Sequence, residues 1–235
     1  MNKEQFIKYV EDLNIKITSK QLDQLEKYYE LLLSWNKLMN LTTIIEHDAV
    51  YLKHFYDSLT LIKACNLNEI SSLADVGSGA GFPGLVLKIF YPELKITIID
   101  SNNKKISFLK EVAQNLELKN ITFVHDRCEK FAHTNKENFD IVTARAVASL
   151  NILIELCLPL VKINGYFIAL KGDVSKEEKT ITNSLKILGG KQEKIIKFNL
   201  PYENSKRSIV KIQKVTTTPS IYPRSYDKIK KKPLK

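Results

Sequence analysis

The sequence predicts an α/β fold, with a mostly parallel sheet covered by helices on both faces. From about residue 70 onwards, short runs rich in β-branched residues alternate with segments whose apolar residues recur at helical spacing. The first of these runs ends in a glycine-rich stretch, residues 77–84, which leads directly into a helical segment. Crossovers between parallel strands are right-handed, and ligands of such a sheet bind in the crevice at the carboxyl ends of its strands.

The first 68 residues are predicted to form a helical cap ahead of the sheet. Thr18 and Gln21 have the spacing of a capping box, which begins a long helix running to about residue 38. A further helical stretch, residues 48–63, carries His54 and Asp57 three positions apart. This pair could be catalytic, but a structural hydrogen bond that holds the cap on the sheet domain is the favoured interpretation.

Seven strands are expected in the region 69–214, which we assign to one sheet domain. The short connection 200–207 suggests that the last two strands are antiparallel. The basic residues 215–235 are expected to form a flexible tail. The expected strands are residues 70–76, 94–99, 120–124, 139–143, 165–170, 191–198 and 208–214, and the expected helices between them are residues 104–118, 149–161 and 175–188.

The glycine-rich stretch distinguishes between two kinds of cofactor site. A dinucleotide fingerprint needs Gly-x-Gly-x-x-Gly, but here Phe82 occupies the place of the third glycine. The observed pattern starts at Asp75 and continues through Gly77, Gly79 and Gly81, a form that we associate with S-adenosylmethionine sites. In that reading Asp75 pairs with the ammonium group of the cofactor. The alternative is a glycine-rich turn without a ligand.

Two charged residues follow other predicted strands at the same edge of the sheet. Asp100 lies 23 residues after Gly77, near the spacing of an acid that accepts hydrogen bonds from ribose hydroxyls. Arg145 follows the fourth strand, where its planar guanidinium could hold a phosphate or the edge of a base. The alternative for Arg145 is an ion pair with Glu129 or Asp126 inside the fold.

Cysteine usage and hydropathy limit the class of protein. The three cysteines are widely spaced and contain no Cys-x-x-Cys pair, which argues against a zinc site or a disulfide framework and for a reducing cytoplasm. We expect no bound metal. No apolar run reaches 18 residues, and residues 1–13 form an amphipathic helix rather than a signal peptide, so no membrane association is expected.

The charge distribution suggests a polyanionic partner. The net charge is +10, and residues 219–235 hold six basic residues against one acid, so half of the excess lies in this short segment. The alternative is compositional bias, because all but four of the 36 basic residues are lysine. On charge alone, binding to nucleic acid stays open.

Several short motifs occur together along the chain: Trp35-Asn36-Lys37, Asn40-Leu41-Thr42, His54 with Asp57-Ser58, Asp75 to Gly84, Ala144-Arg145-Ala146, Ala148-Ser149-Leu150 and Ala169-Leu170-Lys171-Gly172. This combination resembles the RsmG (GidB) family of bacterial 16S ribosomal RNA guanine-N7 methyltransferases, over residues 28–214. It is specific, because a generic methyltransferase would share only the glycine loop and Asp100. Ala144 departs from the serine of many members, and the tail lacks a glycine expected between Arg224 and Lys230.

The resemblance implies a Rossmann-like class I methyltransferase fold, S-adenosylmethionine as cofactor and methylation of the guanine at position 527 of 16S rRNA, near the decoding site. The substrate would be the small ribosomal subunit rather than free RNA, and the enzyme would act as a monomer. Gly77 and Phe82 would line the cofactor site, Cys128 and Glu129 would meet the adenine, and Arg145 would lie between cofactor and target base. The residues expected to contact RNA are Arg145, Lys171, Arg224, Lys230, Lys231 and Lys232.

The chemistry expected for this reaction needs no general base. Guanine N7 carries a free lone pair, so alignment with the methyl donor supplies the catalysis. The sequence lacks the Asn/Asp-Pro-Pro-Tyr/Phe motif expected for methylation of an exocyclic amine, and Cys128 and Cys157 lie away from the place of a cytosine-C5 nucleophile. The alternatives are a small-molecule methyltransferase of the same fold, a noncatalytic RNA-binding or assembly factor and, third, a nicotinamide enzyme.

Overall fold

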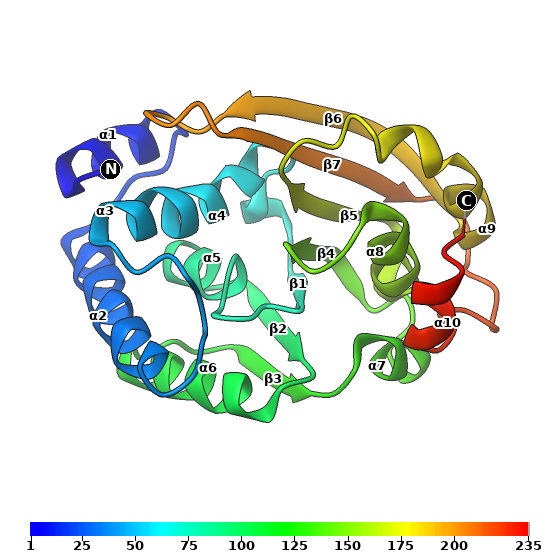
Figure 1. Ribbon diagram of the computed structural model, residues 1–235, viewed down its shortest axis with the longest axis horizontal. Coiled ribbons are helices and arrows are strands. Elements are labelled where there is room, and N and C mark those ends of the chain that lie inside the picture. The colour runs from blue at the N-terminus through cyan, green and yellow to red at the C-terminus, as the bar shows by residue number, and fades with distance from the viewer. Residues whose placement is uncertain (235) are drawn as a thin grey trace.

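The computed structural model describes residues 1–234 and contains one seven-stranded sheet with the order β3-β2-β1-β4-β5-β7-β6 (Figure 1). Neighbouring strands are parallel from β3 to β5, and β7 runs antiparallel to both β5 and β6. The predicted fold class and the antiparallel final pair are therefore confirmed. The strands are β1 (Ser72–Val76), β2 (Lys95–Asp100), β3 (Ile121–His125), β4 (Phe139–Arg145), β5 (Val161–Lys171), β6 (Gly190–Asn199) and β7 (Lys206–Lys214).

Helices cover both faces of the sheet and bury a separate apolar core on each (Figure 1). The N-terminal helices pack with α5 and α6 on one face, whereas α7, α8, α9 and α10 cover the other. The longer helices are α1 (Lys3–Glu11), α2 (Ser19–Asn36), α5 (Gly84–Phe90), α6 (Asn103–Asn115), α7 (Cys128–Thr134), α8 (Leu150–Cys157), α9 (Thr182–Leu188) and α10 (Tyr226–Lys231), and short 3₁₀ turns are η3 (Leu67–Glu69), η4 (Leu158–Leu160) and η5 (Glu178–Thr180). Within residues 1–234, no helix has the length and apolarity that a membrane span requires.

The third helical stretch of the cap changes its winding along its length. It begins as α3 (His47–Val50), widens into the π-helix η1 (Tyr51–Tyr56), and ends as α4 (Asp57–Leu59) and the 3₁₀ turn η2 (Thr60–Lys63). The sequence predicts a helix here but not the π-helical winding. Because π-helices are rare and are frequently found at functional sites, this stretch draws attention to the residues that it presents to the sheet.

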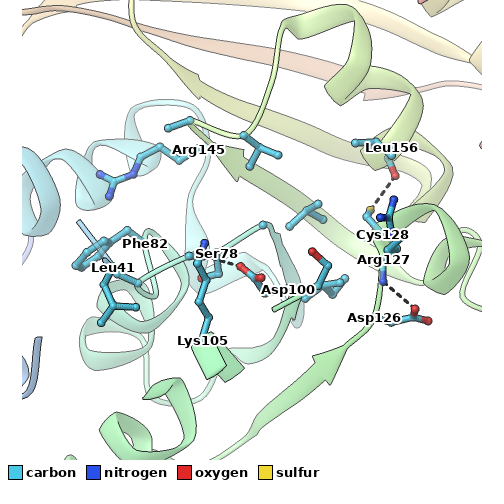
Figure 2. Close-up of a pocket in the computed structure, with 18 of the residues that line it drawn as sticks. Leu41, Ser78, Phe82, Asp100, Lys105, Asp126, Arg127, Cys128, Arg145 and Leu156 are labelled. Carbon is cyan, nitrogen blue, oxygen red and sulfur yellow. Dashed lines mark hydrogen bonds between the residues drawn. The ribbon is translucent and has the colours of Figure 1, made fainter. Parts of the chain in front are cut away.

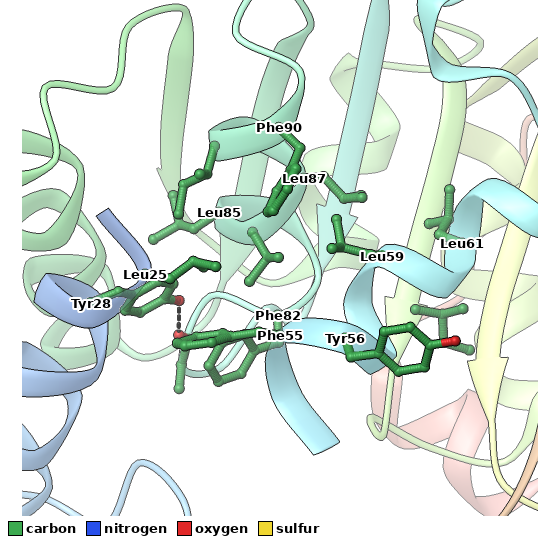
Figure 3. Close-up of a cluster of buried hydrophobic side chains, with 14 of the residues drawn as sticks. Leu25, Tyr28, Phe55, Tyr56, Leu59, Leu61, Phe82, Leu85, Leu87 and Phe90 are labelled. Carbon is green, nitrogen blue, oxygen red and sulfur yellow. Dashed lines mark hydrogen bonds between the residues drawn. The ribbon is translucent and has the colours of Figure 1, made fainter. Parts of the chain in front are cut away.

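Tyr28 of α2 connects the cap to the glycine loop after β1 (Figure 3). Its side chain is fully buried, and its hydroxyl donates a hydrogen bond to the carbonyl oxygen of Ala80 at 2.5 Å. Its ring stacks on Phe82 with 5.5 Å between ring centroids. A Cβ at Gly81 would come within 2.2 Å of the Tyr28 hydroxyl, so this close approach requires glycine.

One edge of the sheet is formed by β6, and the other by β3. Lys191, Lys194 and Lys197 of β6 are exposed, and the pairing with β7 shifts register between Gln192 and Lys194. Charged side chains and an irregular register are features that discourage another strand from pairing with an open edge.

The C-terminal segment differs from the flexible tail expected for it. Through residue 234 it takes a defined course, and α10 packs against α8 (Figure 1). Ile229 is fully buried there among the apolar residues of the α7–α9 face. Tyr222, Tyr226 and Leu234 also pack against this face, and the lysine-rich composition of the segment conceals these apolar contacts, which is why the sequence suggested a solvated tail.

We predict that Tyr28→Phe lowers the free energy of unfolding by about 1–3 kcal/mol, because it leaves the buried carbonyl of Ala80 without its donor while keeping the ring. Urea denaturation measures the change. Tyr29→Phe is the matched control, since the Tyr29 hydroxyl bonds to Ile45 at an exposed position. Equal effects of the two substitutions would contradict the role assigned to Tyr28.

Candidate functional site

A cavity of about 530 Å³, here called the main cavity, opens at the carboxyl ends of β1 to β4 (Figure 2). In Figure 2 Arg145 lies to one side of Asp100, and Arg127 and Cys128 lie to the other. The residues that line it are Leu41, Thr42, His54, Val76, Gly77, Ser78, Gly79, Ala80, Phe82, Ile99, Asp100, Ser101, Lys105, Asp126, Arg127, Cys128, Glu129, Arg145, Ala146, Val147, Leu156 and Tyr226.

The glycine loop forms the floor of the main cavity. Gly77 and Gly79 have φ angles of +67° and +61°, a region that favours glycine. A Cβ added at Gly79 would meet no atom closer than 3.9 Å, so the backbone there is open to the cavity. A Cβ at Gly77 would lie 2.7 Å from Val147, which packs over the loop from the end of β4.

Asp100 lies where the end of β2 meets the glycine loop. Its Oδ2 accepts a hydrogen bond from the Gly79 amide at 3.0 Å, and its Oδ1 accepts one from the Asn102 amide at 2.9 Å. A carboxylate has about four acceptor positions, so these two bonds fix its orientation and leave acceptor capacity at the cavity wall. Such capacity suits a pair of vicinal hydroxyls.

Asp75 does not line the main cavity, contrary to the expectation that it faces a ligand. Its side chain is 0% exposed, and Oδ2 accepts hydrogen bonds from the Ser78 hydroxyl at 2.6 Å and the Gly84 amide at 2.8 Å. Burial raises the pKa of this carboxyl to about 6. Asp75 therefore clamps both ends of the glycine loop from below, and its Oδ1 has no hydrogen-bond partner within residues 1–234.

Cys128 and Glu129 begin α7 and line the main cavity, and Figure 2 shows Cys128 on the side away from Arg145. The Cys128 thiol donates to the carbonyl oxygen of Leu156 at 3.3 Å, which ties this wall to α8. Glu129 is nearly buried, and its carboxylate lies 3.7 Å from the guanidinium of Arg127. Both residues thus lie at the cavity, as the sequence predicts. Their side chains already have partners within the protein, Leu156 for Cys128 and Arg127 for Glu129.

Arg145 ends β4 and points from the sheet toward the helical cap. Its side chain is 12% exposed, and Nη1 donates to the Lys53 carbonyl at 3.0 Å and to Asp57 Oδ2 at 3.2 Å. Arg145 therefore forms an internal ion pair, as the alternative predicted. The carboxylate belongs to Asp57 of the cap, however, and not to Glu129 or Asp126.

His54 fixes the second nitrogen of this guanidinium. Nη2 of Arg145 donates to Nδ1 of His54 at 3.3 Å, and Nε2 of His54 lies 3.0 Å from the Thr42 hydroxyl. The imidazole stacks on Phe82, with 4.5 Å between centroids and 13° between planes. Burial, and then the charge of Arg145, lower the pKa of His54 to about 3, so the ring is neutral at physiological pH. His54 and Asp57 thus hold the cap on the sheet domain, which is the role that the sequence favoured. They do so by accepting hydrogen bonds from Arg145 of β4.

Arg207 is a residue of this site that the sequence reasoning missed. Its Nε donates to Asp57 Oδ1 at 3.0 Å, so one carboxylate receives two guanidinium groups. The signal in the sequence was weak: Arg207 is one of only four arginines, and it lies at the start of an ordinary strand. Arg145, Lys171 and Arg207 line a further cavity of about 280 Å³ that adjoins the main cavity at Arg145.

The residues expected to contact RNA fall into three places. Lys171 lines the 280 Å³ cavity beside Arg145, where its ammonium donates to the Ala148 carbonyl at 2.8 Å and pairs with Glu177 at 3.1 Å. Arg224 points inward onto the buried carboxylate of Glu155, so the structure gives its guanidinium an internal partner instead. The remaining three, Lys230, Lys231 and Lys232, are exposed at the end of α10.

Comparison with known proteins identifies the relatives of this chain. The family described as rRNA small subunit methyltransferase G matches residues 21–209. The chain belongs to this family. Ribosomal RNA small subunit methyltransferase G of Bacillus subtilis (strain 168) is 47% identical over 237 residues, covering 100% of this chain and 99% of that protein. The protein of the same name from Bacillus cereus (strain ZK / E33L) is 50% identical over 229 residues, covering 95% of each. The resemblance drawn from the motifs is confirmed.

Solved structures share the fold at low sequence identity. Pyrococcus horikoshii TYW2 in complex with MeSAdo is 12% identical with a TM-score of 0.54, over 67% of this chain and 61% of that one. A mutant 16S rRNA (adenine(1408)-N(1))-methyltransferase from Catenulisporales acidiphilia, with cosubstrate SAM, is 13% identical with a TM-score of 0.52, over 63% and 87%. Both likenesses show a Rossmann-like class I methyltransferase fold for this member of the family.

We predict that the free energy of unfolding falls more steeply with acid in the parent protein than in His54→Gln. Between pH 6.5 and about 3 the unfolded imidazole binds a proton while the folded one does not, so stability is lost as the pH falls. The difference in slope should approach about 1.4 kcal/mol per pH unit. Urea denaturation from pH 7 to 4 measures it, with His133→Gln on the exposed side of α7 as control. Parallel curves for parent and His54→Gln would refute the neutral buried imidazole.

Proposed function

We propose that this protein uses S-adenosylmethionine to methylate N7 of a guanine in the 16S rRNA of the small ribosomal subunit, the guanine at position 527 that the motif resemblance implies. The observation that carries the proposal is the meeting of the glycine loop, Asp100 and Arg145 in one cavity. The relatives are named as small-subunit rRNA methyltransferases, which supports the substrate class and action in the cytoplasm as a soluble enzyme.

The main cavity fits such a cofactor. Its volume of about 530 Å³ lies within the range of roughly 300–1,000 Å³ found for small-molecule sites. Bare backbone at Gly79 allows close approach, Asp100 offers acceptors for ribose hydroxyls, and Cys128 with Glu129 forms a wall for a purine. When bound, S-adenosylmethionine supplies an electrophilic methyl group on a sulfonium centre.

The residues around the cavity favour a reaction without a general base. His54 is a weak base, with its pKa lowered to about 3, and its Nδ1 is already bonded to Arg145. The Cys128 thiol lines the cavity, but it donates a hydrogen bond to the Leu156 carbonyl oxygen. Because guanine N7 has a lone pair and no proton, holding it in line with the methyl donor can supply roughly 7–11 kcal/mol of the barrier reduction.

Arg145 is the residue that we assign to the target nucleotide. Three of its five guanidinium donors are used by Lys53, Asp57 and His54, which fix the plane of the group. The other donors can serve guanine O6 or a phosphate at the junction between the main cavity and the 280 Å³ cavity. Lys171 lies beside this junction, so its contact with RNA would require the lysine to leave Glu177.

We predict that Arg145→Ala lowers the rate of methyl transfer by about 10²–10³-fold while changing cofactor affinity little, because the lost group contacts the target and not the donor. Methylation of small subunits with labelled cofactor gives the rate, and calorimetry gives the affinity. Lys191→Ala, on the exposed edge strand β6, is the control for activity. A parallel loss of affinity and rate would make Arg145 a structural residue only.

The substrate itself is tested by incubating the protein with labelled S-adenosylmethionine and undermethylated small subunits, and then mapping the labelled nucleotide. We expect a single labelled guanine, with label at N7. Label on small molecules but not on ribosomal particles would favour a small-molecule methyltransferase. Binding to the particles without any binding of the cofactor would favour a noncatalytic assembly factor.

A further inference from the structure

The chain after β7 returns across α8 and is held there by a buried ion pair. Arg224 donates from Nε and Nη2 to the two carboxylate oxygens of Glu155, at 2.7 and 2.6 Å, and its backbone amide bonds to Oε1 at 3.0 Å. The Glu155 side chain is 0% exposed. A bidentate pair of this kind is directional, and removing either partner leaves a charge without its counterion, so the segment is fixed at this point.

Three further contacts fix the position of α10 on the fold. The Nη2 of Arg224 also donates to the Lys232 carbonyl oxygen at 3.0 Å, which connects the chain just before α10 with the residue that follows it. Ile229 is fully buried, and the Asn151 amide donates to the Leu234 carbonyl oxygen at 3.3 Å. The helix is therefore held on both sides of its first residue, Tyr226.

Tyr226 lines the main cavity at the end formed by Asp126, Arg127 and Cys128. The guanidinium carbon of Arg127 lies 5.9 Å from the centroid of the Tyr226 ring, within the range of a cation–π contact. This end of the cavity is the one away from Arg145 (Figure 2). An aromatic ring from the C-terminal segment is thus part of the cavity lining next to Arg127.

We propose that Tyr226 contacts the adenine of S-adenosylmethionine, so that the C-terminal segment is a fixed wall of the cofactor pocket. The inference rests on the proposed function, which places the cofactor in the main cavity. The ring is a flat apolar surface of the kind on which a purine stacks, and it lies at the cavity beside the Arg127 guanidinium. Stacking of a base on an aromatic side chain strengthens binding affinity by about 5- to 150-fold.

The exposed lysines of the same helix give a way to separate this role from binding to RNA. Lys230, Lys231 and Lys232 follow Tyr226 by one turn or more and are exposed. If the segment serves the cofactor through Tyr226, neutralising these charges leaves cofactor affinity unchanged. Deletion of the whole segment would not separate the two roles, because it would also remove Arg224 from buried Glu155.

The experiment is calorimetric titration of the full chain with S-adenosylmethionine and with S-adenosylhomocysteine. The variants are Tyr226→Leu, which keeps an apolar side chain on α10, Tyr226→Phe, which keeps the ring, and the triple variant Lys230→Gln, Lys231→Gln, Lys232→Gln. We expect Tyr226→Leu to weaken the affinity about 5- to 150-fold, and the other two to bind as the parent does. Thermal denaturation of each variant confirms that α10 stays folded.

Equal affinity of Tyr226→Leu and the parent would overturn the inference and leave the proposed function standing. Equal weakening by Tyr226→Phe would assign the effect to the hydroxyl and overturn the ring contact. If the parent bound neither ligand, the proposed function itself would fail. A second readout separates the cofactor from the RNA: Tyr226→Leu should raise the KM for S-adenosylmethionine and leave the KM for small subunits unchanged.

Discussion

The ion pair between Asp57 and Arg145 joins the helical cap to the sheet, and the geometry of the site depends on it. Asp57 is nearly buried and receives Arg145 on one oxygen and Arg207 on the other. A buried pair of this kind adds little net stability, because both charges lose their hydration, but it is costly to break and strongly directional. Its contribution here is orientation: it holds a guanidinium at the carboxyl edge of β4, where a substrate would meet the cavity.

Within residues 1–234, the cap groups that accept hydrogen bonds from Arg145 come from the π-helical stretch η1 and the first residue of α4. The carbonyl of Lys53, the imidazole of His54 and the carboxylate of Asp57 all approach one guanidinium. His54 also stacks on Phe82, which stacks in turn on Tyr28. A displacement of the cap would therefore move Arg145 and the glycine loop together, which couples two halves of the site that come from distant parts of the sequence.

The sequence was informative where the signal is local. Strand–loop–helix alternation predicts the sheet, and the residue that follows each strand predicts that Asp100 and Arg145 share one cavity. What it did not predict depends on contacts between distant segments. Asp57 and Arg145 are 88 residues apart, and nothing in the local pattern says which carboxylate meets which cation. Asp75 turns beneath its loop, where the Ser78 hydroxyl and the Gly84 amide donate to its Oδ2.

The lysines of β6 change how the basic composition of this protein is to be understood. Lys191, Lys194 and Lys197 stand along the β6 edge of the sheet, far along the strand order from the main cavity. Ammonium groups there repel the edge of another copy of the chain and so oppose the growth of intermolecular sheets. Part of the positive charge therefore lies where it can oppose association between sheets, a role that does not involve nucleic acid.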